Sequence, residues 1–175
     1  ERGAQVLVTG RDAEKLAEMA AGSNSIKTLQ ADSAEPDSGT QIVQAALTHW
    51  GRLDLIVNNS GAGQPMPMDG YDAEVMASMS AVNIIAPSQL VRAGLAALRE
   101  TKGAVVNIGT AASRNAVPVM AHYAATKAAL EHLTQSWAME LAKDGIRVNA
   151  VAPGPVKSGA LTGMMGLPVE MAQQI

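Results

Sequence analysis

No cysteine occurs among the 175 residues of the chain. A disulfide framework, a thiolate metal site and a cysteine nucleophile are therefore excluded. This composition is compatible with the cytoplasm, and a cytoplasmic location is our expectation. Positive charge is also sparse: 13 Lys and Arg against 16 Asp and Glu give a net charge of -3, without any basic cluster. Nucleic acids and anionic membranes need concentrated positive charge, so we expect neither as a partner.

Long apolar runs are missing as well. No run approaches the roughly 18 residues that span a bilayer, and the first three residues, Glu-Arg-Gly, do not resemble a secretory signal. The three histidines lack the spacing of a metal site, so no metal is expected. With 47% hydrophobic and 17% charged residues, the chain is expected to be soluble and to form one domain with a substantial core.

Short β-rich runs alternate with longer helical patterns along the chain. Predicted strands cover residues 5–9, 26–30, 53–57, 104–108 and 146–151, and predicted helices cover 12–21, 39–50, 72–100 and 121–143. Strands that are apolar on nearly every residue and separated by helices indicate parallel pairing buried on both faces. We therefore predict a doubly wound, Rossmann-like α/β sheet in a single domain, 1–175. Ligands of such sheets bind beyond the carboxyl ends of the strands.

Tyr123 and Lys127 are four residues apart in a predicted helix, which places a phenol and an ammonium on one helical face. A free tyrosine has a pKa of about 10 and is almost entirely protonated at pH 7. A nearby cation lowers that pKa, so we expect Lys127 to make Tyr123 a proton donor and acceptor. The spacing alone is equally typical of a packed aromatic beside a solvated charge.

Four further motifs accompany this pair in order along the chain. They are Asn58-Asn59-Ser60-Gly61 after one predicted strand, Asn83 in the following helix, Thr110 after the next strand, and Pro153-Gly154 after the last. Together with Tyr-x-x-x-Lys they resemble the short-chain dehydrogenase/reductase family, particularly its NADP-dependent 3-oxoacyl-carrier-protein reductases. The resemblance covers nearly the whole chain.

The resemblance implies four catalytic residues. Tyr123 is expected to be the general acid or base, and Lys127 to lower its pKa and bind the nicotinamide ribose. Thr110 stands where the family usually has a serine that polarises the substrate carbonyl; it offers the same hydroxyl with an extra methyl group. Ser113 is a less favoured substitute, more typical of a loop serine. Asn83 is expected to hold a water linked to Lys127.

Asn83 also has a physical reason to be special. Pro87 lacks the N–H that would bond the Asn83 carbonyl in a helix, so this carbonyl is expected to be free at a kink. The alternative is a polar residue at an ordinary helix bend.

Arg11 follows the first predicted strand, where NAD-preferring family members tend to carry an acidic residue one position earlier, at Gly10 here. A guanidinium suits the 2′-phosphate of NADP, which we therefore prefer over NAD. An exposed arginine neutralised by Asp12 is the alternative. Asp32 resembles the family acid that contacts adenine, and a cap of a turn is the alternative.

The remaining cofactor contacts implied by the resemblance lie in two loops. Asn59 is expected to stabilise the sheet centre, and Gly61 to allow close approach of the cofactor. The loop expected over the nicotinamide comprises Pro153, Gly154, Val156 and Ser158.

The family's glycine-rich diphosphate loop has no counterpart. After Val8-Thr9-Gly10, its further glycines would fall at Glu14 and Leu16. We therefore expect the family's first strand, its loop and its C-terminal segment to be missing. The strands at 6–9 and 53–57 should then lie about two strand spacings apart, roughly 9.6 Å, without pairing. The 175 residues alone should bind NADP poorly and be inactive.

The leading hypothesis is hydride transfer between NADP(H) and a small carbonyl or secondary alcohol. Alternatives are a noncatalytic scaffold or regulatory protein, or an epimerase or dehydratase on the same scaffold. The family also implies a homodimer or homotetramer built through the helices at 72–100 and 121–143.

Overall fold

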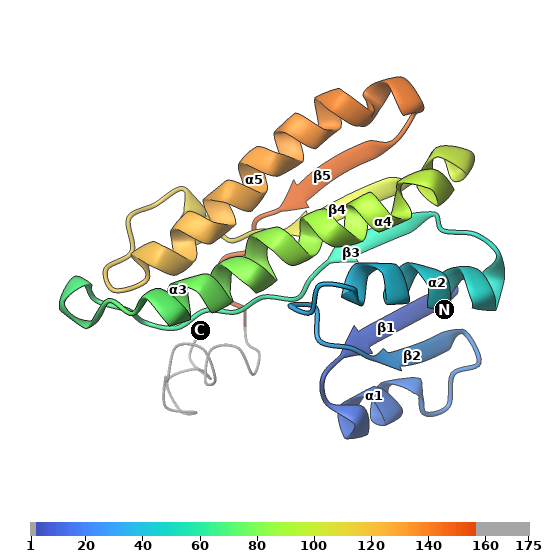
Figure 1. Cartoon of the computed structure of the whole chain (residues 1–175), viewed down its shortest axis with the longest axis horizontal. Coiled ribbons are helices and arrows are strands. Elements are labelled where there is room, and N and C mark those ends of the chain that lie inside the picture. Colours follow the sequence, from blue (N-terminus) through green and yellow to red (C-terminus); the bar gives the residue numbers. More distant parts are fainter. Residues whose placement is uncertain (1–2, 157–175) are drawn as a thin grey trace.

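The computed structural model describes residues 3–156 of the protein (Figure 1). Its strands are β1 (Val6–Gly10), β2 (Ile26–Gln30), β3 (Leu55–Asn58), β4 (Ala104–Ile108) and β5 (Arg147–Val151). Its α-helices are α1 (Ala13–Ala20), α2 (Ser38–Trp50), α3 (Ala73–Ser80), α4 (Ala86–Thr101) and α5 (Ala121–Leu141). A π-helical segment, η2 (Ala81–Ile85), joins α3 to α4, and the short 3-10 turns are η1 (Met68–Gly70), η3 (Ala111–Ser113) and η4 (Ala142–Asp144). Every predicted strand is present, with small shifts at its ends.

All strand pairs in the described residues are parallel, and they form two groups. β1 pairs with β2, and β4 lies between β3 and β5. Within residues 3–156, β1 and β3 are not hydrogen-bonded to each other, so the predicted lack of pairing is confirmed. A cleft lined by Thr9 of β1, Val57 of β3 and Leu90 of α4 lies between them.

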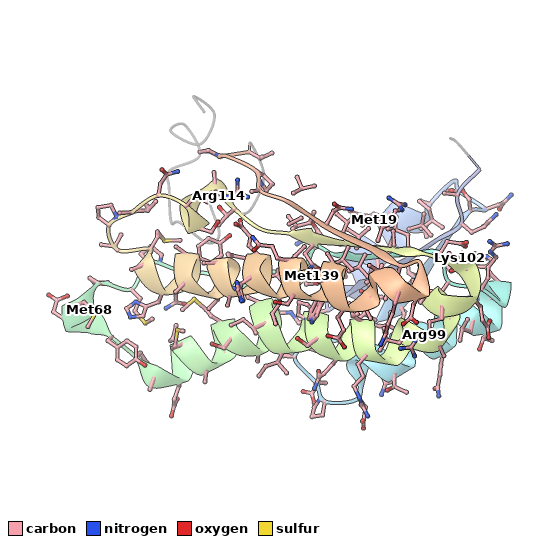
Figure 2. The ribbon with its side chains drawn as sticks, turned by 90° about the horizontal axis from the view of Figure 1, so that it is seen from above. Met19, Met68, Arg99, Lys102, Arg114 and Met139 are labelled. Atoms are coloured by element: carbon pink, nitrogen blue, oxygen red, sulfur yellow. The ribbon has the colours of Figure 1, made fainter. Side chains whose placement is uncertain are left out.

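Helices cover both faces of the strands, which confirms the doubly wound α/β class. Figure 2 shows α4 and α5 together on one side of β4 and β5, while Met19 of α1 lies on the other side from Arg99 of α4. The core between these layers is aliphatic because the strands are apolar on both faces. Its buried members include Ile56, Leu98, Val105 and Val148.

The single helix predicted over 72–100 is instead divided into α3, η2 and α4. The Ala86 N–H reaches back five residues to the Ala81 carbonyl, which widens the helix by one residue. Pro87 has no N–H to donate to the Asn83 carbonyl, so a regular α-helical turn cannot close there. The helix is thus irregular at Asn83, in the form of a π-helical turn.

By length and apolarity, the stretch Ala73–Thr101 passes the test for a membrane span, with a mean hydropathy of 1.3 over its most apolar window. Polar residues interrupt this stretch, so it contains no continuous apolar run of that length. In the fold, Val91 and Leu98 of this stretch are buried in the core, as in a core helix of a globular domain. One such helix is weak evidence for a membrane.

A chain of buried polar side chains crosses the strands beneath the carboxyl edge. Asn58 Nδ2 donates to Asn107 Oδ1 at 2.7 Å, and Asn107 Nδ2 donates to Thr134 Oγ1 at 2.8 Å. These bonds link β3, β4 and α5 and satisfy amides that would be costly to bury unpaired. The sheet-centre role expected of Asn59 therefore belongs to Asn58, whose side chain points inward, while Asn59 is exposed.

Gly39 allows α2 to pack closely on α4, and its replacement tests that packing. A Cβ at this position would lie 2.9 Å from backbone atoms of Gln89 and Leu90. We expect Gly39→Ala to lower the free energy of unfolding by about 1–3 kcal/mol, although alanine is the better helix former. Urea denaturation measures this. The exposed neighbour provides a control, because Thr40→Ala should change stability by only about 0.5 kcal/mol; equal effects would contradict the packing account.

Candidate active site

The parallel strands end at one common edge, and the arrowheads in Figure 1 point the same way. The segments that follow β1, β3, β4 and β5 therefore meet at this edge. The N-terminal half of α5 lies beside the same edge and carries Tyr123 and Lys127. This edge is the candidate active site.

Tyr123 is half-buried on the first turn of α5 and interacts with the Thr110 side chain. Burial raises the pKa of the Tyr123 phenol above its ordinary value of 10.0, and the hydrogen bond with Thr110 partly opposes this. The phenol is therefore protonated at neutral pH and available as a proton donor. Thr110 thus lies where the sequence predicted a hydroxyl partner for Tyr123.

Lys127 lies one turn after Tyr123 and is buried, with 3% of its surface exposed. Its Nζ donates to the carbonyl of Ile108, the last residue of β4, at 2.8 Å. Burial lowers the pKa of the Lys127 amine below 10.5. The prediction that Lys127 lowers the pKa of Tyr123 is wrong for this arrangement, because the phenol pKa is raised and the amine is directed to a strand carbonyl.

Because Gly61 has no side chain, its backbone can lie close to the Lys127 amine. A Cβ on this residue would lie 3.3 Å from Lys127 Nζ and 3.7 Å from Asn83 Oδ1. The absence of a side chain therefore leaves the loop after β3 in contact with the amine. Gly61 thus lies beside Lys127, and the close approach of a cofactor expected at this glycine stays a prediction.

Asn83 is fully buried, and its side chain forms three hydrogen bonds. Oδ1 accepts from the Ala62 N–H at 2.9 Å, while Nδ2 donates to the Ala62 carbonyl at 2.7 Å and to Thr126 Oγ1 at 2.8 Å. Thr126 in turn donates to the Tyr123 carbonyl at 2.7 Å. The side chain thus fixes the loop after β3 against α5, a function that the prediction, which concerned the Asn83 carbonyl, did not include.

The turn after β4 includes a contact that the sequence analysis missed. Ser113 Oγ lies 2.6 Å from Glu131 Oε1, and Arg114 Nε donates to Glu131 Oε2 at 3.2 Å. Ser113 is therefore more than a loop serine. The signal available in the sequence was the four-residue spacing of Tyr123, Lys127 and Glu131, which places Glu131 along the same side of α5.

The residues expected near the adenosine lie at the ends of β1 and β2. Arg11 is mostly exposed, and its Nη1 lies 3.9 Å from Asp32 Oδ2. Asp32 also accepts a hydrogen bond from the Ala34 N–H at 2.9 Å, which is the turn-capping role considered as its alternative. Asp12 caps α1 and pairs with Lys15, so it is not the carboxylate that faces Arg11. Asn59 lines the cleft between β1 and β3.

The loop after β5 lies against the Thr110 turn. The Ala111 N–H donates to the Pro153 carbonyl at 2.8 Å. This hydrogen bond fixes the loop against the turn. Gly154 has no neighbouring atoms within 4 Å of a would-be Cβ, and Val156 is exposed. Ser158 lies outside the described residues.

The lowered pKa of Lys127 predicts how stability depends on pH. Burial penalises the charged amine, so its contribution to stability is lost as pH falls through the folded-state pKa and is restored as pH rises to 10.5. Between the folded-state pKa and pH 10.5, the free energy of unfolding of the wild type should rise, relative to that of Lys127→Met, by up to about 1.4 kcal/mol per pH unit. Urea denaturation between pH 8 and 10.5 measures the difference. The exposed Lys143→Met is the control, and a constant difference for Lys127→Met would contradict the expectation.

Comparison with known proteins agrees with this arrangement. The family model for short chain dehydrogenases matches residues 1–165. The short-chain dehydrogenase/reductase FrzI of Cladobotryum sp is 37% identical over 161 residues, which cover 89% of this chain and 62% of that protein. The chain therefore spans less than two thirds of the length of this relative.

Solved structures of similar proteins share this fold. A metagenomic short-chain oxidoreductase in complex with NADP is 35% identical, with a TM-score of 0.80 over 89% of this chain and 73% of that one. The 3-ketoacyl-(acyl-carrier-protein) reductase of Brucella melitensis, complexed with NADH, is 25% identical, with a TM-score of 0.87 over 98% and 78% of the two chains. Family model, relatives and fold agree, and the chain belongs to the short-chain dehydrogenase family of oxidoreductases.

Proposed function

We propose that the protein transfers a hydride between NADP(H) and a carbonyl or secondary alcohol, with Tyr123 as general acid or base. The observation that carries the proposal is the Tyr123 phenol, half-buried, protonated and in contact with the Thr110 hydroxyl. An oxidoreductase that reduces a carbonyl must deliver one proton to the oxygen, and this phenol is the donor at the site.

Each side chain has a defined part in carbonyl reduction. The reduced nicotinamide, when bound, supplies the hydride that reaches the carbonyl carbon. Thr110 donates a hydrogen bond to the carbonyl oxygen, and Tyr123 transfers its proton to that oxygen as negative charge develops. In alcohol oxidation the same proton transfer runs in reverse. Lys127 binds the nicotinamide ribose.

The residues at the strand edge fit the nicotinamide end of such a cofactor. The Gly61 backbone packs closely beside Lys127 Nζ, and Pro153, Gly154 and Val156 form the loop next to the Thr110 turn. Arg11, Asp32 and Asn59 are assigned to the adenosine end. The chain contains no glycine-rich diphosphate loop, so we expect the 175 residues alone to bind NADP weakly and to lack turnover.

Asn83 keeps a second proposed role as part of a proton path. Its carbonyl faces the position where Pro87 lacks an N–H, so the oxygen is suited to hold a water linked to Lys127. That water would connect the phenol to solvent after each proton transfer.

NADP is proposed over NAD because of Arg11. The metagenomic relative binds NADP and the Brucella reductase binds NADH, so relatives support a nicotinamide cofactor without deciding between the two. Arg11 is mostly exposed, and its 3.9 Å contact with Asp32 leaves the guanidinium available to a phosphate. A small-molecule substrate, a homodimer or homotetramer, and a cytoplasmic location stay predictions.

Tyr123→Phe tests the catalytic proposal directly. In the protein expressed from its complete gene, we expect the kcat for ketone reduction with NADPH to fall by about 100- to 10,000-fold, because the proton donor is lost. Tyr71→Phe is the matched control and should retain activity, since Tyr71 packs on His122 and is outside the catalytic set. Equal activity of Tyr123→Phe and the wild type would eliminate the catalytic role of Tyr123, and absence of activity in both would favour the noncatalytic alternative. NADPH consumed in proportion to product would exclude the epimerase and dehydratase alternatives.

Arg11→Ala tests the cofactor preference. The loss of one charged contact to a 2′-phosphate should weaken NADPH binding by roughly 10- to 100-fold and leave NADH binding nearly unchanged. Arg52→Ala is the control, because Arg52 pairs with Asp54 before β3 at the other end of the sheet. Titration of cofactor fluorescence measures both affinities; parallel losses for the two cofactors would contradict the role of Arg11.

A further inference from the structure

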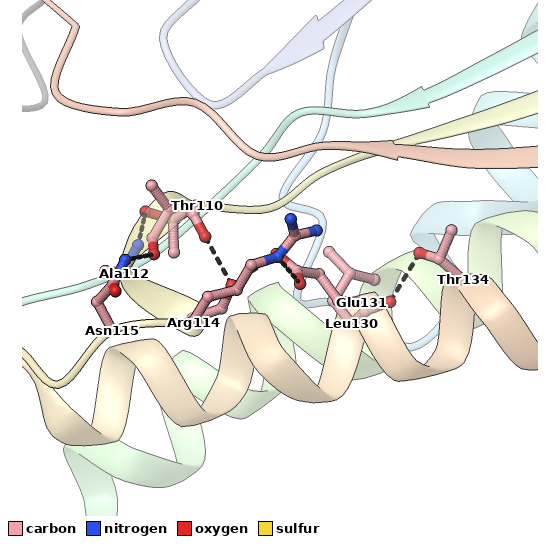
Figure 3. Close-up of polar contacts among 9 residues, drawn as sticks. Thr110, Ala112, Arg114, Asn115, Leu130, Glu131 and Thr134 are labelled. Atoms are coloured by element: carbon pink, nitrogen blue, oxygen red, sulfur yellow. Dashed lines mark hydrogen bonds and ion pairs between the residues drawn. The ribbon is translucent and has the colours of Figure 1, made fainter.

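The Glu131 carboxylate forms two hydrogen bonds with the turn after β4, and Figure 3 shows the one with Arg114. Oε1 accepts from Ser113 Oγ at 2.6 Å, and Oε2 accepts from Arg114 Nε at 3.2 Å. A Cβ on Gly109 would lie 2.9 Å from Oε1, so the carboxylate packs directly on the turn backbone. Glu131 therefore lies against both ends of the 109–114 turn, at Gly109 and at Arg114.

The burial of Glu131 separates this contact from an ordinary surface ion pair. Only 13% of the Glu131 side chain is exposed, whereas the Arg114 side chain is 69% exposed. Exposed ion pairs contribute little, but a carboxylate that loses its hydration needs donors that are fixed in place. Ser113 and Arg114, both from the turn, supply those donors.

Thr110 lies in the middle of the segment that Glu131 holds. Ser113 Oγ also lies 2.6 Å from the Thr110 carbonyl, and Thr110 Oγ1 accepts from the Ala112 N–H at 3.3 Å. On the opposite side, backbone bonds to Val151 and Pro153 tie the turn to β5 and its loop. The turn is thus held between β5 and α5, and Glu131 supplies the α5 side.

We propose that Glu131 is a positioning residue that holds the 109–114 turn so that the Thr110 hydroxyl faces the Tyr123 phenol. Tyr123 and Glu131 are carried by the same helix, so one rigid element sets both ends of the Thr110 contact. The effect of Glu131 on catalysis rests on the proposed function, whereas its contacts with the turn are independent of that function.

The direction of the Tyr123 pKa change distinguishes positioning from a direct charge effect. Thr110 lowers the pKa of the phenol, so a displaced turn raises it. Removing the Glu131 charge, or freeing the positive Arg114, would act in the opposite direction and lower the phenol pKa. Lys127 on the same helix and the neighbouring His122 are unchanged by the substitution.

The chain contains two tyrosines, so Tyr71→Phe leaves Tyr123 as the only one. In that background, tyrosinate absorbance as a function of pH reports the Tyr123 pKa without any need for cofactor or activity. Thr110→Val measures the full effect of losing the hydroxyl. We expect Glu131→Ala to raise the Tyr123 pKa toward the Thr110→Val value, and Glu131→Gln, which keeps an acceptor for Ser113, to raise it less.

Glu140→Gln is the matched control, because it removes an exposed carboxylate from the same helix and should leave the Tyr123 pKa unchanged. An unchanged or lowered pKa in Glu131→Ala would overturn the proposal, as would Thr110→Val without effect. Circular dichroism at each pH monitors folding. If Glu131→Ala does not fold, Ser113→Ala removes one tether without changing any charge, and this variant must raise the Tyr123 pKa.

Kinetics in the complete protein separate this inference from the proposed function. We expect Glu131→Ala to lower kcat by roughly 10- to 100-fold with little change in the KM for NADPH, because the hydroxyl is misplaced and the cofactor contacts remain. A raised Tyr123 pKa in a protein without reductase activity would support the positioning role and reject the oxidoreductase function. Reductase activity with unaltered kcat in Glu131→Ala would reject the positioning role alone.

Discussion

The buried amide of Asn83 is the interaction on which the arrangement of the site depends. It satisfies both backbone polar groups of Ala62 and one hydroxyl of Thr126, so it joins η2, the loop after β3 and α5 at one point. Each of these groups would lose about 1–3 kcal/mol if buried without a partner. Because Gly61 precedes Ala62, the same interaction sets the distance between the loop and the Lys127 amine.

Burial, rather than pairing of opposite charges, dominates the electrostatics of Tyr123 and Lys127. Desolvation raises the pKa of Tyr123 and lowers the pKa of Lys127, so both shifts favour the neutral forms. The Ile108 carbonyl compensates part of this cost for the amine at 2.8 Å. The Tyr123 phenol is therefore protonated at neutral pH.

The segments around the site are held by side chains from α5 and by backbone bonds from β5. Thr126 bonds Asn83, which holds the loop after β3, and Glu131 bonds the turn after β4. On the other side of that turn, the Val151 carbonyl accepts from the Gly109 N–H. α5 thus organises two loops besides carrying Tyr123 and Lys127. Because one helix lies beside the carboxyl ends of several strands in this fold, it can orient several side chains at once.

The sequence by itself determined the order of strands and helices, the parallel class and the identity of the Tyr123 and Lys127 pair, because periodicity and spacing are local properties. The tertiary structure decided which way the polar side chains turn. Asn58 rather than Asn59 crosses the sheet, and Lys127 bonds a strand carbonyl. These outcomes depend on partners that are distant in the chain, such as Asn107, and on burial, which no local pattern specifies.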